Sequence, residues 1–363
     1  MNVGVERVEA ADAAGIDERL SAGDAPFVIS DSVGERVRAE AWSPAALRAR
    51  AGGREATLDR SETPRFDFDE RGRQRYATSR STVADALDLV EGARAPGPCY
   101  YLRGTQLSAF GLDDDALLPR AFQAARGAMV KRLWVSSEGS VTPLHYDTRN
   151  NFLAQMHGRK TVTLLPASEH ERAYPLGYTG TNLVSLVDPD RLDAARFPRF
   201  PSELLLTVSL EPGDALFIPP FWWHHVRSLD LCVSVNVFWQ LRAEQSLVAN
   251  SVEYLRILYG RNKLGRLFEE DGEDLGSRLA RLAERAHARG LDCAAALLCA
   301  GSARATLSGM TPGERDALTP DERRKVEHWT FVGEFVARTG KTPRADEIEA
   351  MLAGVTSFAS HPV

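Results

Sequence analysis

Hydrophobic and polar positions follow three different patterns along the chain. Residues 1–130 mix short apolar runs with segments of helical spacing, and residues 131–242 contain a succession of short apolar runs. Residues 243–363 place apolar side chains three and four positions apart, which is typical of helices with one buried face. We therefore expect a mixed first zone, a β-rich middle zone and a helical last zone.

The middle zone predicts several strands in succession. Its apolar runs are rich in β-branched and aromatic residues and are separated by Gly, Pro and Asp, as strands are. They are KRLWVSS, NFLAQM, KTVTLLP, LLLTVSL, ALFIPP and CVSVNVFW. No long helical pattern interrupts them, so an antiparallel sandwich or barrel is favoured.

The flanking zones carry helix signals. Ser43-Pro44 predicts a helix start, because Ser caps a helix and Pro fits its first turn. Thr311 and Thr319 are each followed by Pro and then by a capping-box Glu. We expect one domain over residues 1–242, with its core at 131–242 and a flank at 1–130. A separate helical region is expected over residues 243–363.

Composition and charge narrow the class of protein. Hydrophobic residues make up 44% of the 363 residues, which is enough for a sizeable core. The formal net charge of −6 argues against DNA or an anionic membrane as a partner. The four cysteines are too few for a disulfide scaffold, and no apolar run is long enough to span a bilayer. The first residues lack a signal-peptide pattern, so we expect a cytoplasmic protein.

Candidate chemistry lies in two segments of the β-rich zone. In an extended strand residues i and i+2 face the same way, so His145 and Asp147 should point together. A His and a carboxylate on one face are two-thirds of a facial triad for non-haem iron. A third ligand can come from the His224-His225 pair after PPFWW on a distant strand. Taken alone, each segment is more simply interpreted as a set of ordinary core or surface residues. Only the combination of the two segments favours a metal site.

The two segments also carry a resemblance to a known family. The matching strings are TPLHYD at 142–147, NFLAQ at 151–155, GRK at 158–160, PGDALFIP at 212–219, WWHH at 222–225 and VN at 235–236. They resemble the JmjC-type and cupin-like-domain Fe(II)/2-oxoglutarate oxygenases, including the asparaginyl hydroxylase that inhibits hypoxia-inducible factor. The resemblance implies a mainly β fold with helical additions. Its core would be a double-stranded β-helix of the cupin or jelly-roll type, with an N-terminal α/β flank and a C-terminal helical region.

The resemblance also implies roles for particular residues. By position, His145, Asp147 and His224 match the iron ligands, and His225 is left a structural role. Lys160 matches the lysine that binds the far carboxylate of 2-oxoglutarate. Thr142, Tyr101, Asn151 and Asn236 match further residues around that co-substrate. Arg149 follows the metal motif closely and is a candidate for substrate contact or an ordinary exposed arginine. Trp239 is a second candidate, for substrate contact or for core packing.

The implied activity is hydroxylation of an unactivated C–H bond with O₂, releasing succinate and CO₂. A protein or peptide side chain is the first expectation for the substrate. The same chemistry on a small metabolite, a carrier-bound amino acid, a tRNA base or an N-methyl group is an alternative. A cupin that binds metal or ligand without catalysis is another, and it would have no need of Lys160 or Thr142 as a carboxylate clamp. The helical end resembles the dimerisation helices of this family, so a homodimer is expected.

Overall fold

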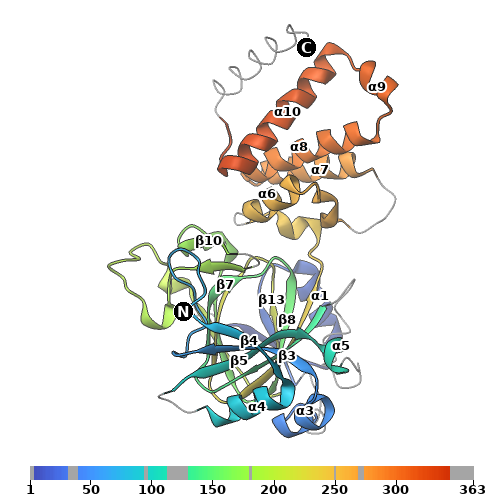
Figure 1. The fold of residues 1–363 in the computed structure, drawn as a ribbon. Helices are drawn as coiled ribbons and strands as arrows, with labels where there is room; N and C mark the ends of the chain where they lie inside the picture. The colour runs from blue at the N-terminus through green and yellow to red at the C-terminus, as the bar shows by residue number, and fades with distance from the viewer. Residues whose placement is uncertain are drawn as a thin grey trace. The chain divides into compact units, whose positions relative to one another are not determined.

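The computed structural model describes residues 4–31, 40–93, 97–112, 130–179, 182–248, 251–268 and 274–343. The chain divides into two compact units, residues 1–240 and residues 241–363. The first contains two β-sheets with short helices, and the second is helical (Figure 1). Residues 344–363 of the predicted helical region lie outside the described part.

The larger sheet has nine strands. In spatial order these are β1 (Glu6–Glu9), β2 (Phe27–Ser30), β13 (Ala215–Ile218), β8 (Asn150–His157), β15 (Cys232–Trp239), β6 (Val130–Ser136), β5 (Cys99–Gln106), β3 (Glu55–Ser61) and β4 (Ala77–Thr82). Every neighbouring pair is antiparallel except β1 and β2. The sheet therefore joins strands of the predicted core to strands of the N-terminal flank.

The smaller sheet has six antiparallel strands. Their order is β10 (Pro175–Thr179), β11 (Asn182–Ser185), β7 (Val141–Tyr146), β14 (Trp223–Ser228), β9 (Lys160–Leu165) and β12 (Leu206–Leu210). The chain passes repeatedly between the two sheets, as in a jelly roll. The predicted double-stranded β-helix with helical additions is confirmed.

Two hydrophobic clusters hold the sheets in place. Val162 and Leu164 of the smaller sheet pack with Leu153 and Leu216 of the larger one in a cluster between the sheets. The outer side of the larger sheet packs against α3 (Pro44–Ala51) and α4 (Val83–Gly92) in a separate cluster (Figure 1). The remaining helices of this unit are α1 (Ala13–Ala22) and α5 (Leu107–Phe110). The larger sheet is thus covered on both faces, and the space inside the barrel is left for a site.

The second unit has its own core. It is built from α6 (Val252–Gly260), α7 (Leu275–Ala288), α8 (Asp292–Gly309), α9 (Pro312–Asp316) and α10 (Pro320–Thr339). Leu255, Leu279, Leu297 and Val336 bring four of these helices into one apolar cluster. Both expected capping boxes form, at Thr311 and at Thr319. No helix of the described residues is long and apolar enough to cross a membrane.

Candidate active site

Three side chains that can bind a metal meet on the smaller sheet. His145 of β7 and His224 of β14 are direct cross-strand partners, and their ring centroids are 4.1 Å apart. Asp147 follows the end of β7, and its Oδ2 lies 3.6 Å from Nε2 of His224. One ligand atom from each of the three lies within 4.8 Å of the others. The structure thus brings the His-x-Asp pair and the distant His together.

Both histidines are held in the tautomer that a metal needs. Nδ1 of His145 lies 2.8 Å from the carbonyl oxygen of Pro143, and Nδ1 of His224 lies 3.1 Å from that of Trp222. A carbonyl can only accept, so each Nδ1 carries the hydrogen and each Nε2 keeps its lone pair. Burial also lowers the pKa of His224 well below its ordinary value, and His145 adds to this effect. Neutral imidazoles are the form that binds metals.

A pair of asparagines orients the carboxylate. Asn236 of β15 donates to the side-chain oxygen of Asn151 at 2.7 Å, and Asn151 donates to Oδ2 of Asp147 at 3.3 Å. Burial raises the pKa of Asp147, and the neighbouring His145 and the hydrogen bond from Asn151 oppose this rise. A divalent cation at the site would favour the ionised carboxylate further. These two asparagines therefore link the larger sheet to the metal site.

A β-bulge explains how Thr142 reaches the same cavity as His145. The two residues are three positions apart, so in a regular strand they would face opposite sides. The pairing of β7 with β14 shifts by one residue between these positions, because His224 pairs with His145 whereas Val226 pairs with Thr142. One extra residue reverses the alternation. Thr142 then faces the interior, where its hydroxyl is a hydrogen-bond partner of Tyr101.

Lys160 points into the barrel and is only 2% exposed. It begins β9 and is the cross-strand partner of Ser228 on β14. Burial lowers the pKa of its ammonium group, and within the described residues no carboxylate pairs with it. A buried cation without a counter-ion is unfavourable. The surroundings of Lys160 therefore fit an anionic ligand, such as the far carboxylate of 2-oxoglutarate.

These residues line one cavity of about 540 Å³ between the two sheets. The sequence-predicted residues on its wall are Tyr101, Thr142, His145, Asp147, Arg149, Asn151, Lys160, His224 and Asn236. Trp239 is not among the lining residues. It is 8% exposed and packs in the core against Phe152 and Phe217, while its neighbour Phe238 lines the cavity. The structure thus places Trp239 in the core and not at the cavity.

Several cavity residues were not anticipated from the sequence. Arg132 and Trp134 of β6 both line the cavity. Strand alternation in KRLWV could have indicated this, because Leu133 between them is buried on the other face. Arg103 and the buried Asp59 lie on strands of the flank and form an ion pair at 2.6 Å. Their strand pairing joins segments far apart in sequence, and no local pattern specifies it.

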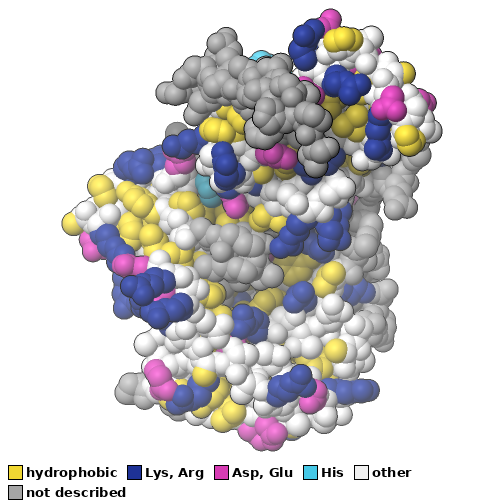
Figure 2. Space-filling view, turned by 45° about the horizontal axis from the view of Figure 1, so that its top comes forward, with side chains coloured by type: hydrophobic (Ala, Val, Ile, Leu, Met, Phe, Trp, Pro, Cys, Tyr) yellow, Lys and Arg dark blue, Asp and Glu magenta, His cyan; other side chains and the backbone are white. Residues whose placement is uncertain are grey.

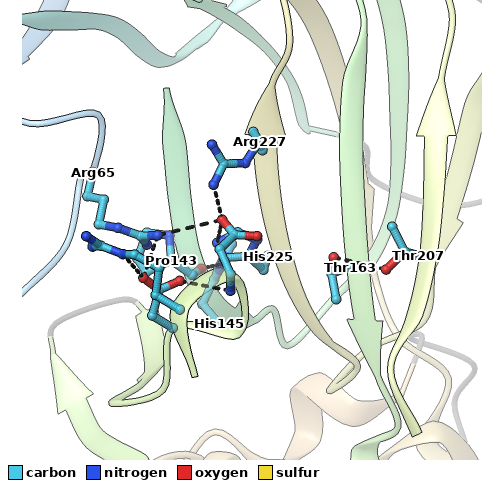
Figure 3. Close-up of polar contacts among 10 residues, drawn as sticks. Arg65, Pro143, His145, Thr163, Thr207, His225 and Arg227 are labelled. Carbon is cyan, nitrogen blue, oxygen red and sulfur yellow. Dashed lines mark hydrogen bonds and ion pairs between the residues drawn. The ribbon is translucent and has the colours of Figure 1, made fainter. Parts of the chain in front are cut away.

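His225 faces away from the cavity toward a second polar cluster. Its Nε2 lies 3.4 Å from Oδ2 of Asp190, and Asp188 is close by. Arg65 pairs with Asp188 at 2.5 Å, and Arg227 pairs with Asp190 (Figure 3). Guanidinium groups already neutralise both carboxylates, so this cluster is a poor cation site. It ties the loop before β12 to the outer side of β14.

Comparison with known proteins identifies the class that this fold and site define. The chain belongs to the cupin-like domain family, whose sequence profile matches residues 13–245. The matched region contains all the cavity residues named above. Family membership and the JmjC-type resemblance of the motifs therefore agree.

Individual relatives match over shorter stretches. Lysine-specific demethylase JMJ30 of Arabidopsis thaliana is 38% identical over 136 residues, which is 37% of this chain and 32% of the relative. Lysine-specific demethylase 8 of Xenopus tropicalis is 38% identical over 117 residues, 32% of this chain and 26% of the relative. HSPB1-associated protein 1 of Homo sapiens is 34% identical over 123 residues, 33% of this chain and 25% of the relative. The matches thus cover about a third or less of each of these relatives.

Proposed function

We propose that this chain is an Fe(II)- and 2-oxoglutarate-dependent dioxygenase that hydroxylates an unactivated C–H bond. The observation that carries the proposal is the position of Lys160. This buried ammonium group shares one cavity with the His145, Asp147 and His224 cluster. A metal-binding cupin without catalysis needs the three ligands but has no use for a buried, unpaired lysine beside them. A 2-oxo acid co-substrate accounts for both features.

The chain's own residues hold and orient the two groups. His145 and His224 would offer Nε2, and Asp147 a carboxylate oxygen, on one side of the iron. Three protein ligands leave coordination positions for the 2-oxo acid and for O₂. The carbonyls that hold each Nδ1, and Asn151 behind Asp147, keep these ligands aimed before the metal arrives.

Lys160, Thr142 and Tyr101 would bind the far carboxylate of 2-oxoglutarate. The ammonium would supply charge, and the two hydroxyls would supply directed hydrogen bonds. Iron and 2-oxoglutarate bound here would supply the oxidising chemistry with O₂, with succinate and CO₂ as by-products. The protein contributes geometry and the exclusion of water.

A protein or peptide side chain is the substrate that we propose. The family resemblance favours it, and so do the relatives, which are named for lysine demethylation and for association with the protein HSPB1. Demethylation of an N-methyl group is the second candidate, because two of the relatives described above are named lysine-specific demethylases. Formaldehyde release would identify demethylation, and a gain of one oxygen atom in the product would identify hydroxylation.

Succinate release tests the proposed chemistry without a known substrate. The wild-type protein with Fe(II), 2-oxoglutarate and O₂ should form succinate slowly, because 2-oxoglutarate oxygenases turn over weakly without their substrate. His145→Ala should abolish this, and Lys160→Ala should require far more 2-oxoglutarate. Equal succinate formation by all three proteins would contradict the proposal, because the activity would then not come from this site.

A further inference from the structure

The cavity carries more positive charge than the proposed metal and co-substrate can use. Four cationic and two anionic side chains are among its described lining residues. They are Arg103, Arg132, Arg149 and Lys160 on one hand and Asp59 and Asp147 on the other. On the face of the molecule drawn in Figure 2, which extends beyond the cavity, Lys and Arg side chains are more prominent than Asp and Glu side chains. This imbalance bears on the charge of the substrate.

Most of these charges have a partner or an assigned ligand. Arg103 forms an ion pair with Asp59. Under the proposed function, Asp147 and the two charges of 2-oxoglutarate balance the metal dication and Lys160. The net charge of the loaded site would then be set by Arg132 and Arg149. Both lie near enough to the metal site to affect Asp147 electrostatically.

Arg132 lies on β6, opposite Asn236 of β15. Its guanidinium is partly buried and donates to the carbonyl oxygen of Gly104 at 2.8 Å. A carbonyl fixes the direction of the side chain but does not neutralise its charge. No carboxylate of the described residues pairs with Arg132, so its remaining N–H groups can serve a ligand.

Arg149 occupies the turn between β7 and β8, two residues after Asp147. It is exposed yet lines the cavity, which places it at the rim. Within the part of the chain that the structure describes, it too has no carboxylate partner. One fixed guanidinium inside and one at the rim are suited to an anionic group that enters from solvent, because guanidinium binds carboxylate in a bidentate fork.

We propose that the peptide substrate presents an Asp or Glu carboxylate to Arg132 and Arg149, and that lysine and arginine side chains are rejected at this position. This inference rests on the proposed function, because the charge balance assumes bound metal and 2-oxoglutarate. A cationic side chain would face two guanidiniums without a compensating carboxylate, which selects against it. The substrate class would then differ from the one that the names of the lysine-specific relatives indicate.

Peptide libraries of defined charge test this proposal. Nine-residue fluorescent peptides with randomised flanks would carry Asp, Glu, Asn, Gln, Lys or Arg at the centre. Binding is measured by fluorescence anisotropy on the full chain loaded with Mn(II), as an inert substitute for Fe(II), and 2-oxoglutarate. The Asp or Glu library should bind about 10- to 100-fold more tightly than its amide counterpart, as expected for hydrogen bonds to charged groups. Binding should weaken with salt.

Variants assign the preference to the two arginines. Arg132→Gln and Arg149→Gln should each reduce the preference for acidic peptides, whereas Arg149→Lys should keep part of it. Arg80→Gln is the matched control, since Arg80 is exposed on β4 and pairs with Glu55 outside the cavity. It should bind all libraries as the wild type does.

The results distinguish a failure of the proposed oxygenase function from a failure of the acidic-substrate proposal. Calorimetry of Mn(II) and 2-oxoglutarate binding comes first, and failure of that step would contradict the proposed function. If the protein loads normally, equal binding of all libraries, a preference for Lys or Arg, or no peptide binding would each overturn the acidic-substrate proposal. A preference that survives both glutamine substitutions would also overturn it, because another surface would then select the peptide.

Discussion

Lys160 combines a functional role with a cost to the folded protein. Its side chain is 2% exposed, and burial lowers the pKa of the ammonium group. In the metal-free protein no carboxylate of the described residues offsets the loss of hydration of this charge. Binding of an anion would supply the missing partner. Function and stability should therefore respond in opposite directions when the charge is removed.

Lys160→Met is the substitution that separates the two effects. Met has a similar length and no charge, so the free energy of unfolding of the ligand-free protein should rise by about 1 kcal/mol or more. Affinity for 2-oxoglutarate should fall about 10- to 100-fold, as for the loss of a charge-assisted pair. Urea denaturation and calorimetry measure the two quantities. A lower free energy of unfolding together with an unchanged affinity for 2-oxoglutarate would show that Lys160 stabilises the fold and does not bind the co-substrate.

His170 makes the stability of the first unit depend on pH. Its ring stacks on Trp223 with centroids 5.7 Å apart, and its buried Nδ1 has no hydrogen-bond partner among the residues that the structure describes. Burial lowers the pKa of His170 below its ordinary value of 6.5, and Glu171 offsets only part of this. The unfolded chain therefore binds the proton more readily, so the free energy of unfolding falls as the pH drops below about 6.5.

His170→Phe should reduce this dependence. The phenyl ring keeps the stacking surface and removes the titrating nitrogen. Melting temperatures measured between pH 7.5 and 5 should fall less steeply for the variant than for the wild type. An identical slope for both proteins would show that His170 titrates in the folded protein as it does in the unfolded chain.

The alternation of strand residues predicted the metal-binding residues of the site. It did not predict which further residues line the cavity. His145 and Asp147 could be placed on one face from their spacing, and the structure brings them together with His224. Thr142 could not be placed in this way, because a bulge in β7 reverses the alternation. Arg103 and Asp59 come from flanking strands whose pairing depends on contacts far apart in sequence. Local patterns contain no information about such pairings.

Helix α10 packs against α8 at Gly333, where there is no space for a side chain larger than a hydrogen atom. A Cβ atom on Gly333 would lie 2.3 Å from Cβ of Ala300 and 2.7 Å from the hydroxyl of Tyr259. Contacts this short would push the two helices apart. Gly309 near the end of α8 has no atom within 4 Å of such a Cβ. The two glycines thus differ in packing, although both lie in helices.

Gly333→Ala should destabilise the second unit by about 1 to 3 kcal/mol, which is typical of overpacking. Gly309→Ala should be neutral or slightly stabilising, because Ala favours the helix. Chemical denaturation followed by circular dichroism at 222 nm reports on this helical unit. Equal stability of the two variants would mean that α10 does not pack on α8 as described.

At the scale of the whole molecule, the fold class was predictable and the full extent of the larger sheet was not. The apolar runs from 131 to 242 indicated the barrel strands, and the capping boxes indicated the ends of two helices. Strands β3 and β4 were not expected, because ATLDRS and ATSRST contain few large apolar residues. β3 is placed by its pairing with β5, and β4 lies at the edge of the nine-stranded sheet because it pairs with β3.

We propose that the chain forms a homodimer through its C-terminal helices. Trp329 and Phe331 of α10 are only partly buried within the unit. A second copy would cover more of this aromatic surface. Light scattering at micromolar concentration should give twice the mass of the 39.9 kDa chain. A monomeric mass would contradict the proposal and leave the oxygenase assignment unaffected.

An anaerobic titration of the metal-free protein with Fe(II) and 2-oxoglutarate is the most direct test of whether the cavity binds both groups. The wild-type protein should show a visible charge-transfer band from the iron–2-oxoglutarate chelate. The band should be absent in His145→Ala and should need about 10- to 100-fold more 2-oxoglutarate in Lys160→Ala. If the wild-type protein binds no iron and forms no band, the oxygenase assignment is wrong, and the barrel is a binding module.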